Sequence, residues 1–398
     1  MPIRRSWRQP PRKTRQGQKR RRPMAASRRN SRLIRVGAVA VGGDSPVSIQ
    51  SMTNTDTRDA AATLNQIRAL HRLGCQIIRV AVPDPAAAAA IRAIRAESPI
   101  PVVADIHFDY RLALAAMENG ADAIRLNPGN LNDEGGLEQV AALAVERGIP
   151  IRVGANSGSV RTALVRRYQS RGMSRDEAVA EALVDSALEQ CRLLESFGVT
   201  QIKAALKSSS VPVTVAAYRK FAARTDYPLH IGVTEAGTPA RGVIKSAVGI
   251  GTLLMEGIGD TLRVSLTGDP AEEVIAGRRI LEACGLRDAM PEIISCPTCG
   301  RTEIDLIGLA EKVEELVADI KESGHDIKLR KVAVMGCAVN GPGEARDADL
   351  GVAGSRNGKL VIFKFGKVVG AFDPDAGFEY FKLEILKNST RTGEDRNV

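Results

Sequence analysis

The sequence predicts an α/β protein in which a (β/α)8 TIM-type barrel is followed by a smaller α+β domain. From about residue 45 to residue 285, short β-branched runs alternate with Ala-, Leu- and Glu-rich helical stretches. The alternation repeats eight times, and eight consecutive strand–helix units in this length favour a closed parallel barrel. Beyond residue 295 the pattern changes to one long helix with short strands around a Gly-rich turn, which indicates a second domain.

The eight expected units follow one another in order along the chain. The strands are expected at 47–52, 76–82, 101–106, 123–127, 150–156, 201–206, 229–235 and 261–266. The helices are expected near 60–73, 85–97, 110–119, 133–147, 174–197, 212–224, 240–256 and 271–284. An open, doubly wound sheet is the alternative, because one strand missed or invented in a single sequence changes the closure.

The domain boundaries follow from composition. Residues 1–32 are basic and are expected to form a disordered tail, and residues 33–285 are expected to form the barrel. Residues 286–295 contain a proline and no periodicity, which is typical of a linker. In the second domain, 296–385, a helix is expected near 303–322 and strands at 331–337, 349–353 and 359–365. Residues 386–398 are polar and are expected to fray.

The formal charge of +10 belongs to the tail and not to the body of the protein. Residues 1–35 hold 14 of the 56 Lys and Arg residues and no acidic residue, which leaves 42 basic against 46 acidic residues elsewhere. Nucleic acid is therefore not an expected partner of the body, although a basic arm could touch an anionic surface. A targeting segment, or a true start at Met24, are alternative interpretations of the tail.

Other classes are disfavoured by what the sequence lacks. No apolar run approaches the roughly 20 residues that span a bilayer, so no membrane association is expected. Six cysteines in 398 residues do not make a disulfide scaffold, and a reducing cytoplasm with a metal site fits them better.

Polar side chains gather at the carboxyl ends of the expected strands, which meet at one mouth in a barrel. These residues are Ser51, Asn54, Arg79, Asp105, His107, Arg125, Asn127, Arg152, Asn156, Lys203, Lys207, Glu235, Arg263 and Ser265. Several Arg and Lys side chains at one mouth predict an anion site, most simply for a phosphate or diphosphate. The turn at 127–130 and the loop at 154–159 add backbone N–H groups suited to the same ligand.

Three cysteines predict a metal centre in the second domain. Cys296 and Cys299 are spaced so that both sulfurs can reach one centre, and Cys337 opens a Gly- and Pro-rich turn. Three thiols leave one position for substrate, solvent or another residue, and Glu344 is the candidate for it. We interpret the set as iron–sulfur ligands, with zinc and a redox thiol pair as alternatives. Cys75, Cys191 and Cys284 lie in apolar contexts typical of buried thiols.

Seven segments resemble the bacterial 4-hydroxy-3-methylbut-2-en-1-yl diphosphate synthases, the GcpE/IspG family. The similarity extends over about residues 32–365. The segments are SMTNT (51–55), VADIHFDYRLAL (103–114), RLNPGN (125–130), GVTEAG (232–237), GIGDTLRVSLT (257–267), SCPTCGR (295–301) and MGCAVNGPGEA (335–345).

The resemblance implies a reductive enzyme of isoprenoid biosynthesis by the methylerythritol phosphate pathway. It implies two-electron ring opening and dehydroxylation of 2-C-methyl-D-erythritol 2,4-cyclodiphosphate to (E)-4-hydroxy-3-methylbut-2-enyl diphosphate. It also implies a [4Fe–4S] cluster held by Cys296, Cys299, Cys337 and Glu344, with electrons from reduced flavodoxin or ferredoxin. The family works as a homodimer in which the cluster domain of one subunit closes over the barrel of its partner.

The resemblance also assigns residues of the barrel to the substrate. The matching positions are Arg79, Asp105, Arg125, Asn127, Arg152, Asn156, Lys207, Glu235, Arg263 and Ser265. At the end of the seventh strand, Glu235 is the candidate catalytic proton donor, with the orientation of an arginine as its alternative role. One departure concerns the KASD sequence of many members, which here reads Lys207-Ser-Ser-Ser210, so nothing is carried over to Ser210.

Two rival interpretations remain at this point. One is a barrel methyltransferase of the pteridine-binding type with zinc on the C-terminal cysteines. The other is a non-catalytic iron–sulfur scaffold or a nucleic-acid-binding protein that uses the basic arm.

Overall fold

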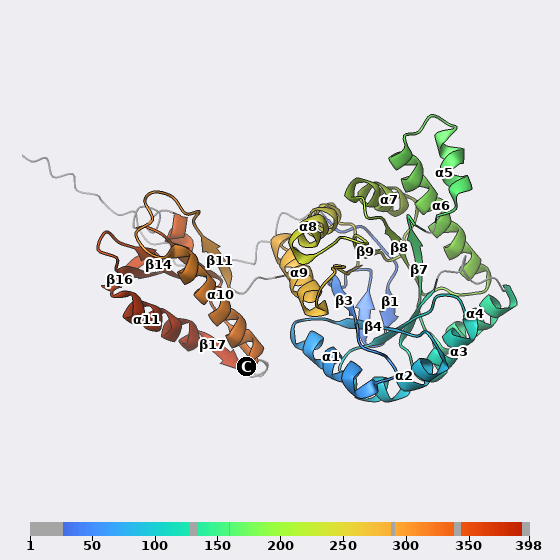
Figure 1. The fold of residues 1–398 in the computed structure, drawn as a ribbon, viewed down its shortest axis with the longest axis horizontal. Helices are drawn as coiled ribbons and strands as arrows, with labels where there is room; N and C mark the ends of the chain where they lie inside the picture. The colour runs from blue at the N-terminus through green and yellow to red at the C-terminus, as the bar shows by residue number, and fades with distance from the viewer. Residues whose placement is uncertain (1–26, 127–133, 159, 288–290, 338–343, 392–398) are drawn as a thin grey trace, which may run out of the picture.

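The computed structural model describes residues 27–126, 134–158, 160–287, 291–337 and 344–391, which form two lobes (Figure 1). The larger lobe contains a parallel sheet of eight strands in the order β8-β7-β6-β5-β4-β3-β10-β9. A parallel bridge between Ala204 of β8 and Leu229, the residue before β9, closes the ring. The strands are β3 (Ser48–Met52), β4 (Ile77–Ala81), β5 (Val102–Asp105), β6 (Ala123–Leu126), β7 (Ile151–Asn156), β8 (Ile202–Lys207), β9 (His230–Ile231) and β10 (Thr261–Leu262).

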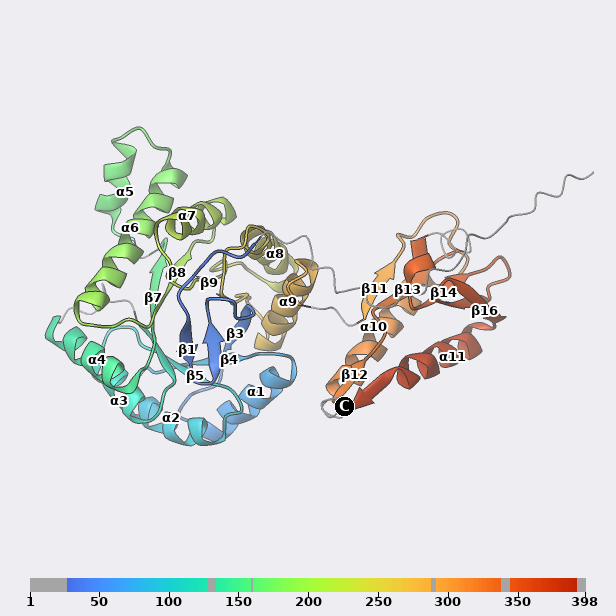
Figure 2. The same ribbon diagram turned by 180° about the vertical axis from the view of Figure 1, so that it is seen from behind.

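All eight expected strands are therefore present, and the closed barrel is confirmed over the open sheet. Helices surround the barrel (Figures 1 and 2). They are α1 (Ala60–Arg72), α2 (Pro85–Glu97), α3 (Tyr110–Glu118), α4 (Glu134–Arg147), α5 (Thr162–Gln169), α6 (Arg175–Ser196), α7 (Val211–Arg224), α8 (Pro239–Met255) and α9 (Pro270–Ala283). Sequence reasoning missed α5, which lacks buried residues and so carries no core-facing stripe.

Local capping fixes where these helices begin. The Asp84 carboxylate accepts a hydrogen bond from Ala87 N at 2.8 Å, and Pro85 occupies the first turn of α2. Ser174 and Glu177 form a reciprocal capping box at the start of α6. The Asp84 cap follows a short loop from the end of β4 at Ala81, so the start of α2 stays close to the strand end, whereas α6 begins only after α5.

The bottom of the barrel is covered by a hairpin that sequence reasoning did not predict. Its strands, β1 (Ile34–Val36) and β2 (Val39–Val41), pair antiparallel and bury Ile34, Val36 and Val41. These side chains pack against Ile77, Val103 and Ala123 inside the barrel. The hairpin therefore covers the end of the barrel opposite the mouth.

The described residues begin within the segment predicted as a disordered tail. Arg28 forms an ion pair with the buried Asp260 at 2.8 Å, and Arg29 donates to the carbonyl of Thr225 at 2.6 Å. Arg32 pairs with Asp226 at 2.7 Å and lies over the Tyr227 ring. The predicted boundary at residue 32 was wrong for these three arginines. An arginine can lay its aliphatic stem on the barrel surface while its guanidinium group binds nearby carbonyls and carboxylates.

The smaller lobe is built on a five-stranded sheet in the order β11-β13-β14-β15-β16. These strands are β11 (Glu292–Ser295), β13 (Lys331–Met335), β14 (Leu350–Gly354), β15 (Leu360–Lys364) and β16 (Lys367–Phe372). Helices α10 (Leu306–Glu322) and α11 (Pro374–Lys387) pack on it around Val313, Val332 and Phe381. The 3-10 helix η2 (Glu344–Asp347) precedes β14.

Two predicted boundaries of this lobe also move. The predicted linker 286–295 contains β11, which pairs with β13, so its end belongs to the second sheet. The predicted frayed end begins within α11 and continues into β17 (Ser389–Arg391), which pairs with β12 (His325–Ile327). None of the helices in the described ranges is long and apolar enough to span a bilayer.

Candidate functional site

The register of the barrel places its inward-facing side chains in layers. In a closed barrel of eight parallel strands, the inward-facing side chains of alternate strands share a layer of four. The pairing of β6 with β7 and of β7 with β8 aligns Arg125, Arg152 and Lys203 along one row of neighbours. Because the strands tilt, that row descends from the mouth toward the barrel floor. We infer that Arg79, Arg125, Ala205 and Arg263 form the layer just below the mouth.

Asp105 is the centre of one half of the mouth. Its carboxylate lies 3.1 Å from Nη1 of Arg125 and 3.7 Å from Nε of Arg79. His107 lies 3.6 Å from the same carboxylate and 3.3 Å from Arg125. Arg79 also donates to the Met52 sulfur at 3.0 Å. Burial alone would raise the pKa of Asp105, but Arg79, the hydrogen bond with His107 and Arg125 hold it well below its usual range.

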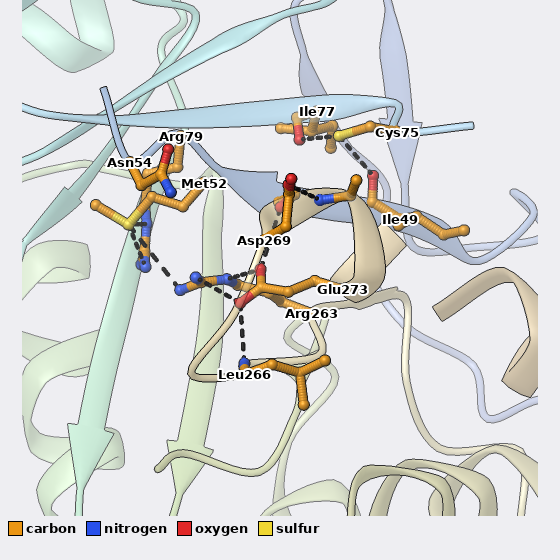
Figure 3. A network of polar contacts seen from close by, with 12 residues as sticks. Ile49, Met52, Asn54, Cys75, Ile77, Arg79, Arg263, Leu266, Asp269 and Glu273 are labelled. Carbon is orange, nitrogen blue, oxygen red and sulfur yellow. Dashed lines mark hydrogen bonds and ion pairs between the residues drawn. The ribbon is translucent and has the colours of Figure 1, made fainter. Parts of the chain in front are cut away.

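Glu273 organises the other half of the mouth, as Figure 3 shows. Its carboxylate accepts from Arg263 Nε at 3.2 Å and Nη2 at 3.3 Å, and from the backbone N–H of Leu266 at 3.0 Å. The hydroxyl of Ser51 also donates to it, at 3.2 Å. Ser51 therefore faces α9 and not the mouth, which corrects the sequence-based expectation that it lines the mouth.

Sequence reasoning missed Glu273 altogether. It lies in the first turn of α9, where an acidic residue is ordinarily explained by the helix dipole. The structure separates two neighbours that are identical in the sequence: Glu272 is exposed, whereas Glu273 is buried on the face toward the barrel. A buried carboxylate needs a partner, and here the partner is a mouth arginine.

Arg152 and Lys207 complete the cationic lining of the described mouth. Burial lowers the pKa of both side chains well below the ordinary values, and neighbouring cations lower it further. Burial likewise lowers the pKa of Arg79, to about 10. A Cβ at Gly232 would lie 2.9 Å from the Lys207 amino group, so this glycine leaves room for the lysine. The mouth therefore contains more buried positive charge than its two carboxylates compensate, which favours an anionic ligand.

The remaining predicted mouth residues fall into three groups. Asn156 ends β7, and Ser265 is half-buried two residues beyond Arg263. Asn127 and the turn 127–130 lie outside the described residues. Glu235 is exposed in the loop after β9 and has a backbone φ of 51°. A positive φ costs energy for a non-glycine residue, and such residues are concentrated at functional sites.

The KASD departure has a structural explanation. The Ser210 hydroxyl accepts from the backbone N–H of Val213 at 3.5 Å and so caps α7. Aspartate and serine are both good caps, so the replacement keeps the capping role and removes one negative charge near the mouth.

Cys296 and Cys337 follow adjacent parallel strands of the smaller lobe. Ser295 of β11 pairs with Val334 of β13, so both chains leave the sheet on the same side. The Cys296 sulfur accepts a hydrogen bond from the backbone N–H of Gly336 at 3.2 Å, directly beside Cys337. Cys337 is buried. The two thiols therefore belong to one corner of the sheet.

Cys299 lies on the exposed loop that follows. The backbone N–H of Arg301, and then its side chain, lower the pKa of the Cys299 thiol. Arg301 also interacts electrostatically with Cys337. A thiol that ionises readily is the donor chemistry that iron–sulfur clusters use.

No group of three or more His, Cys, Asp or Glu with the spacing of a metal site is found among the described residues. The backbone of Glu344 begins η2, but its side chain and residues 338–343 lie outside the description. The ligand set predicted from the sequence therefore stays a prediction, with two of its thiols at one corner of the sheet.

Two family models match the two lobes. The GcpE TIM-barrel domain matches residues 31–278, and the GcpE protein C-terminal domain matches residues 292–387. The match to the first covers most of the barrel lobe, including every described mouth residue.

Curated relatives cover nearly the whole chain. A protein of Geobacter sulfurreducens is 58% identical over 85% of this chain and 92% of its own length. A protein of Caldanaerobacter subterraneus subsp. tengcongensis is 54% identical over 92% of this chain and 99% of its own. Both are named 4-hydroxy-3-methylbut-2-en-1-yl diphosphate synthase (flavodoxin). By its two matched domains and by these relatives, the chain belongs to the GcpE family.

Proposed function

We propose that this chain is a 4-hydroxy-3-methylbut-2-en-1-yl diphosphate synthase, an oxidoreductase of isoprenoid biosynthesis. Its substrate is 2-C-methyl-D-erythritol 2,4-cyclodiphosphate and its product (E)-4-hydroxy-3-methylbut-2-enyl diphosphate. The observation that supports this most strongly is the cationic mouth of the buried Arg79, Arg125, Arg152 and Lys207 and the half-buried Arg263, matched among the described residues by the carboxylates of Asp105 and Glu273. Relatives at up to 58% identity carry the same activity in their names.

The reaction consumes two electrons. The bond between carbon and one ring phosphate oxygen breaks, so that the cyclic diphosphate becomes a linear one. A hydroxyl oxygen leaves as water after taking up a proton, and a carbon–carbon double bond forms. Reduced flavodoxin or ferredoxin supplies the electrons, and the relatives' names specify flavodoxin.

The barrel residues bind and orient the diphosphate. Arg125 and Arg79 share Asp105, and Arg263 is held in a two-point contact by Glu273, so these guanidinium groups are fixed before the ligand arrives. Pre-oriented donors lose little entropy on binding and suit the paired oxygens of a phosphate. Asn127, Asn156, Lys207 and Ser265 complete the proposed substrate set.

Glu235 is proposed as the proton donor to the departing hydroxyl. It stands on the loop after β9 in a left-handed backbone conformation that ordinarily favours glycine. With this positive φ, the side chain leaves the backbone in a different direction from that of a residue in an extended strand. A carboxylic acid is a suitable general acid for the loss of the hydroxyl.

Cys296, Cys299, Cys337 and Glu344 would hold a [4Fe–4S] cluster. Thiolates are the usual ligands of such clusters, and the Cys299 thiol ionises more readily than an ordinary cysteine. The cluster would supply one electron at a time to the substrate, and the weaker carboxylate ligand would leave one iron exchangeable. This assignment favours iron over the rival zinc, which prefers four N or S ligands.

We also propose a homodimer in which the smaller lobe acts on the barrel of the partner subunit. Within one chain, the ion pair of Arg279 on α9 with Glu314 on α10, at 3.9 Å, joins the lobes through exposed side chains of the helical ring. The mouth lies at the carboxyl ends of the strands, away from that outer surface. A smaller lobe that contacts the helical ring of its own barrel does not cover the mouth of that barrel, so its cysteines can face the barrel mouth of the partner subunit.

Mixing two inactive variants tests this arrangement. Arg125→Met should lose about 3 kcal/mol of transition-state stabilisation, roughly a hundredfold in kcat/KM, because Asp105 then keeps only Arg79 and His107. Cys337→Ser should lose the cluster. Co-expressed in one dimer, the two variants should regain activity, because an intact barrel meets an intact partner lobe. Mixed dimers that stay as inactive as the separate variants would contradict catalysis between subunits.

Anaerobic turnover tests the proposed reaction itself. Protein purified without oxygen should be brown, contain iron, and convert the cyclodiphosphate to the allylic diphosphate with an artificial reductant, followed by ³¹P NMR. Colourless protein with stoichiometric zinc and no product would instead favour the barrel methyltransferase.

A further inference from the structure

Beneath the mouth, the barrel contains polar side chains that its described parts leave without partners. The atoms that lack a hydrogen bond are Ser48 Oγ, Gln50 Oε1, Lys203 Nζ, Thr261 Oγ1 and both ring nitrogens of His230. Every one of these residues is at most 2% exposed. Thr261 is the direct neighbour of both Ser48 and His230 in the sheet, so the group is continuous across β3, β10 and β9.

Lys203 is the charged member of this group and the deepest lysine in the barrel. It pairs across the sheet with Arg152, and the descending row places it in the layer of Ile77, Ala123 and Thr261. Ile77 and Ala123 pack on the hairpin that closes the barrel floor. The lysine therefore extends from an apolar floor toward the cations above it, and at 0% exposure it has no contact with solvent.

The charged and titratable groups around Lys203 come from every neighbouring element. They are Arg79 on β4, Asp105 on β5, Arg125 on β6, Arg152 on β7, Lys207 on β8, His230 on β9, Arg263 after β10, Glu273 on α9 and Tyr218 on α7. Asp105 is bonded to Arg125 and Glu273 to Arg263, while the Tyr218 hydroxyl donates to the His230 carbonyl. No carboxylate among them is left for Lys203.

Charge and burial both oppose a permanent ammonium ion at this position. Burial, and after it Arg152 and Arg79, lower the pKa of Lys203 to about 7. A like charge directly across the sheet is unfavourable, and a buried cation without a partner is more so. A negatively charged ligand in the mouth favours the protonated form of Lys203, because Coulomb attraction between the two is only weakly screened inside the barrel.

We propose that Lys203 is a proton-uptake site coupled to the mouth: it is uncharged in the ligand-free enzyme and gains a proton when a diphosphate binds. The inference rests on the proposed function, since it takes the mouth ligand to be the cyclic diphosphate. Lys203 is a positioning residue and not a catalytic one, because it acts through the charge beneath Arg152 and Arg79. The added charge tightens ligand binding without a new contact.

The polar group around Lys203 also provides a route for that proton. Hydroxyl groups of Ser48 and Thr261 both donate and accept, and a neutral imidazole at His230 donates from one nitrogen and accepts at the other. Buried groups of this mixed kind are commonly bridged by internal water. A chain of such groups can pass a proton between Lys203 and the mouth without exposing the barrel interior.

Isothermal titration of the wild-type protein with the cyclodiphosphate tests the coupling directly. Each phosphorus of the ring carries one strongly acidic oxygen, so the ligand itself neither gains nor loses protons near neutrality. Titrations in Pipes and in Tris, whose ionisation enthalpies differ, give the number of protons taken up on binding. We expect Lys203 to contribute an uptake that approaches one proton at about pH 8 and falls toward zero at about pH 6, where it is already charged.

Lys203→Met identifies the group responsible. Methionine fills a similar volume without charge, so the fold should be retained, and the uptake at about pH 8 should fall by close to one proton. Affinity at that pH should fall roughly tenfold, and the loss should be smaller at about pH 9 than the loss at about pH 7. Lys382→Met, at an exposed position on α11, is the matched control and should leave both quantities unchanged.

The outcomes separate the two proposals. If the wild-type protein does not bind the cyclodiphosphate, the proposed function is wrong. If it binds with no dependence on the buffer, or if Lys203→Met retains the full uptake, the role of Lys203 is wrong while the proposed function stands.

Discussion

The two lobes bury opposite kinds of side chain inside their sheets. The barrel interior contains arginines, lysines, a histidine and carboxylates that are almost fully buried, beneath an outer core of Ile, Val, Leu and Ala. The sheet of the smaller lobe buries Val313, Val332, Ile362 and Phe381, and its reactive cysteines stand where strands end. The barrel thus buries the residues of its proposed anion site in its interior, whereas the smaller lobe buries an apolar core and carries its proposed cluster cysteines at the edge.

This difference predicts how each lobe responds to change. Buried charges that lack full compensation cost stability and are retained for binding, so the barrel should respond to pH, salt and anions. An apolar core is insensitive to these variables, so the smaller lobe should respond mainly to the loss of its cysteines and any metal they hold. Substitutions that remove chemistry from one lobe should therefore leave the chemistry of the other intact.

The largest expected effect comes from the smaller lobe. Cys337→Ser should lower kcat by at least about a thousandfold, because the proposed cluster loses a thiolate ligand, while the protein still binds the cyclodiphosphate. Iron content, absorption near 400 nm and turnover are measured together. Cys284→Ala, at a buried thiol outside the sites, is the control and should keep its iron. A Cys337→Ser protein with full iron and full turnover would contradict the assignment.

The barrel loops give the next effect. Glu235→Gln should lower kcat by several hundredfold with little change in KM, because an amide cannot supply the proton to the leaving hydroxyl. Its iron content should equal that of the wild type. Full turnover with an intact cluster would show that Glu235 does not donate the proton.

A smaller effect is expected at Glu273, which holds Arg263 from α9. Glu273→Gln keeps the shape but not the charge, so kcat/KM should fall about tenfold through KM, as Arg263 loses its fixed orientation. The matched control is Glu272→Gln, at the exposed neighbouring position of the same helical turn. Equal effects of the two substitutions would contradict the orienting role.

The smallest effect concerns stability and separates the lobes by pH. The folded barrel keeps Lys203 uncharged above about pH 7, whereas the unfolded chain keeps it protonated up to about pH 10. The unfolded state therefore binds more protons across this window, and the free energy of unfolding should rise with pH through it. Urea unfolding followed by circular dichroism should show this rise in the wild type and a flatter profile in Lys203→Met. Parallel profiles would contradict an uncharged Lys203.

Periodicity sufficed to predict the eight barrel strands, since hydrophobic runs and helical stretches alternate without interruption. It could not predict the β1–β2 hairpin, whose three-residue strands are too short to give a pattern and are defined by packing on the barrel floor. The same limit applies to Arg28 and Arg32, whose partners Asp260 and Asp226 lie more than 190 residues away in the chain.

The site was predictable where residue type and strand position coincide. Arg79, Asp105, Arg125 and Arg263 were expected at the mouth from their strand ends. Arg79 and Arg125 share Asp105 there, and Arg79 and Arg263 both approach the Met52 sulfur. Glu273 was missed because its role depends on the direction of a helical side chain. Lys203 was expected at the mouth but lies lower, in the layer of Ile77, Ala123 and Thr261, because its depth depends on the tilt of the strands. Ser51 was assigned to the wrong face because side chains alternate along a strand and it stands one residue out of phase.

The most direct measurement is the number of electrons consumed for each allylic diphosphate formed. Reductant is titrated anaerobically into iron-loaded protein with excess cyclodiphosphate, and the product is quantified by ³¹P NMR. The proposed reaction predicts two electrons for each molecule of product, and no product without reductant. Ring opening that proceeds without reductant, or protein that binds the cyclodiphosphate and consumes electrons but releases no allylic diphosphate, would contradict it.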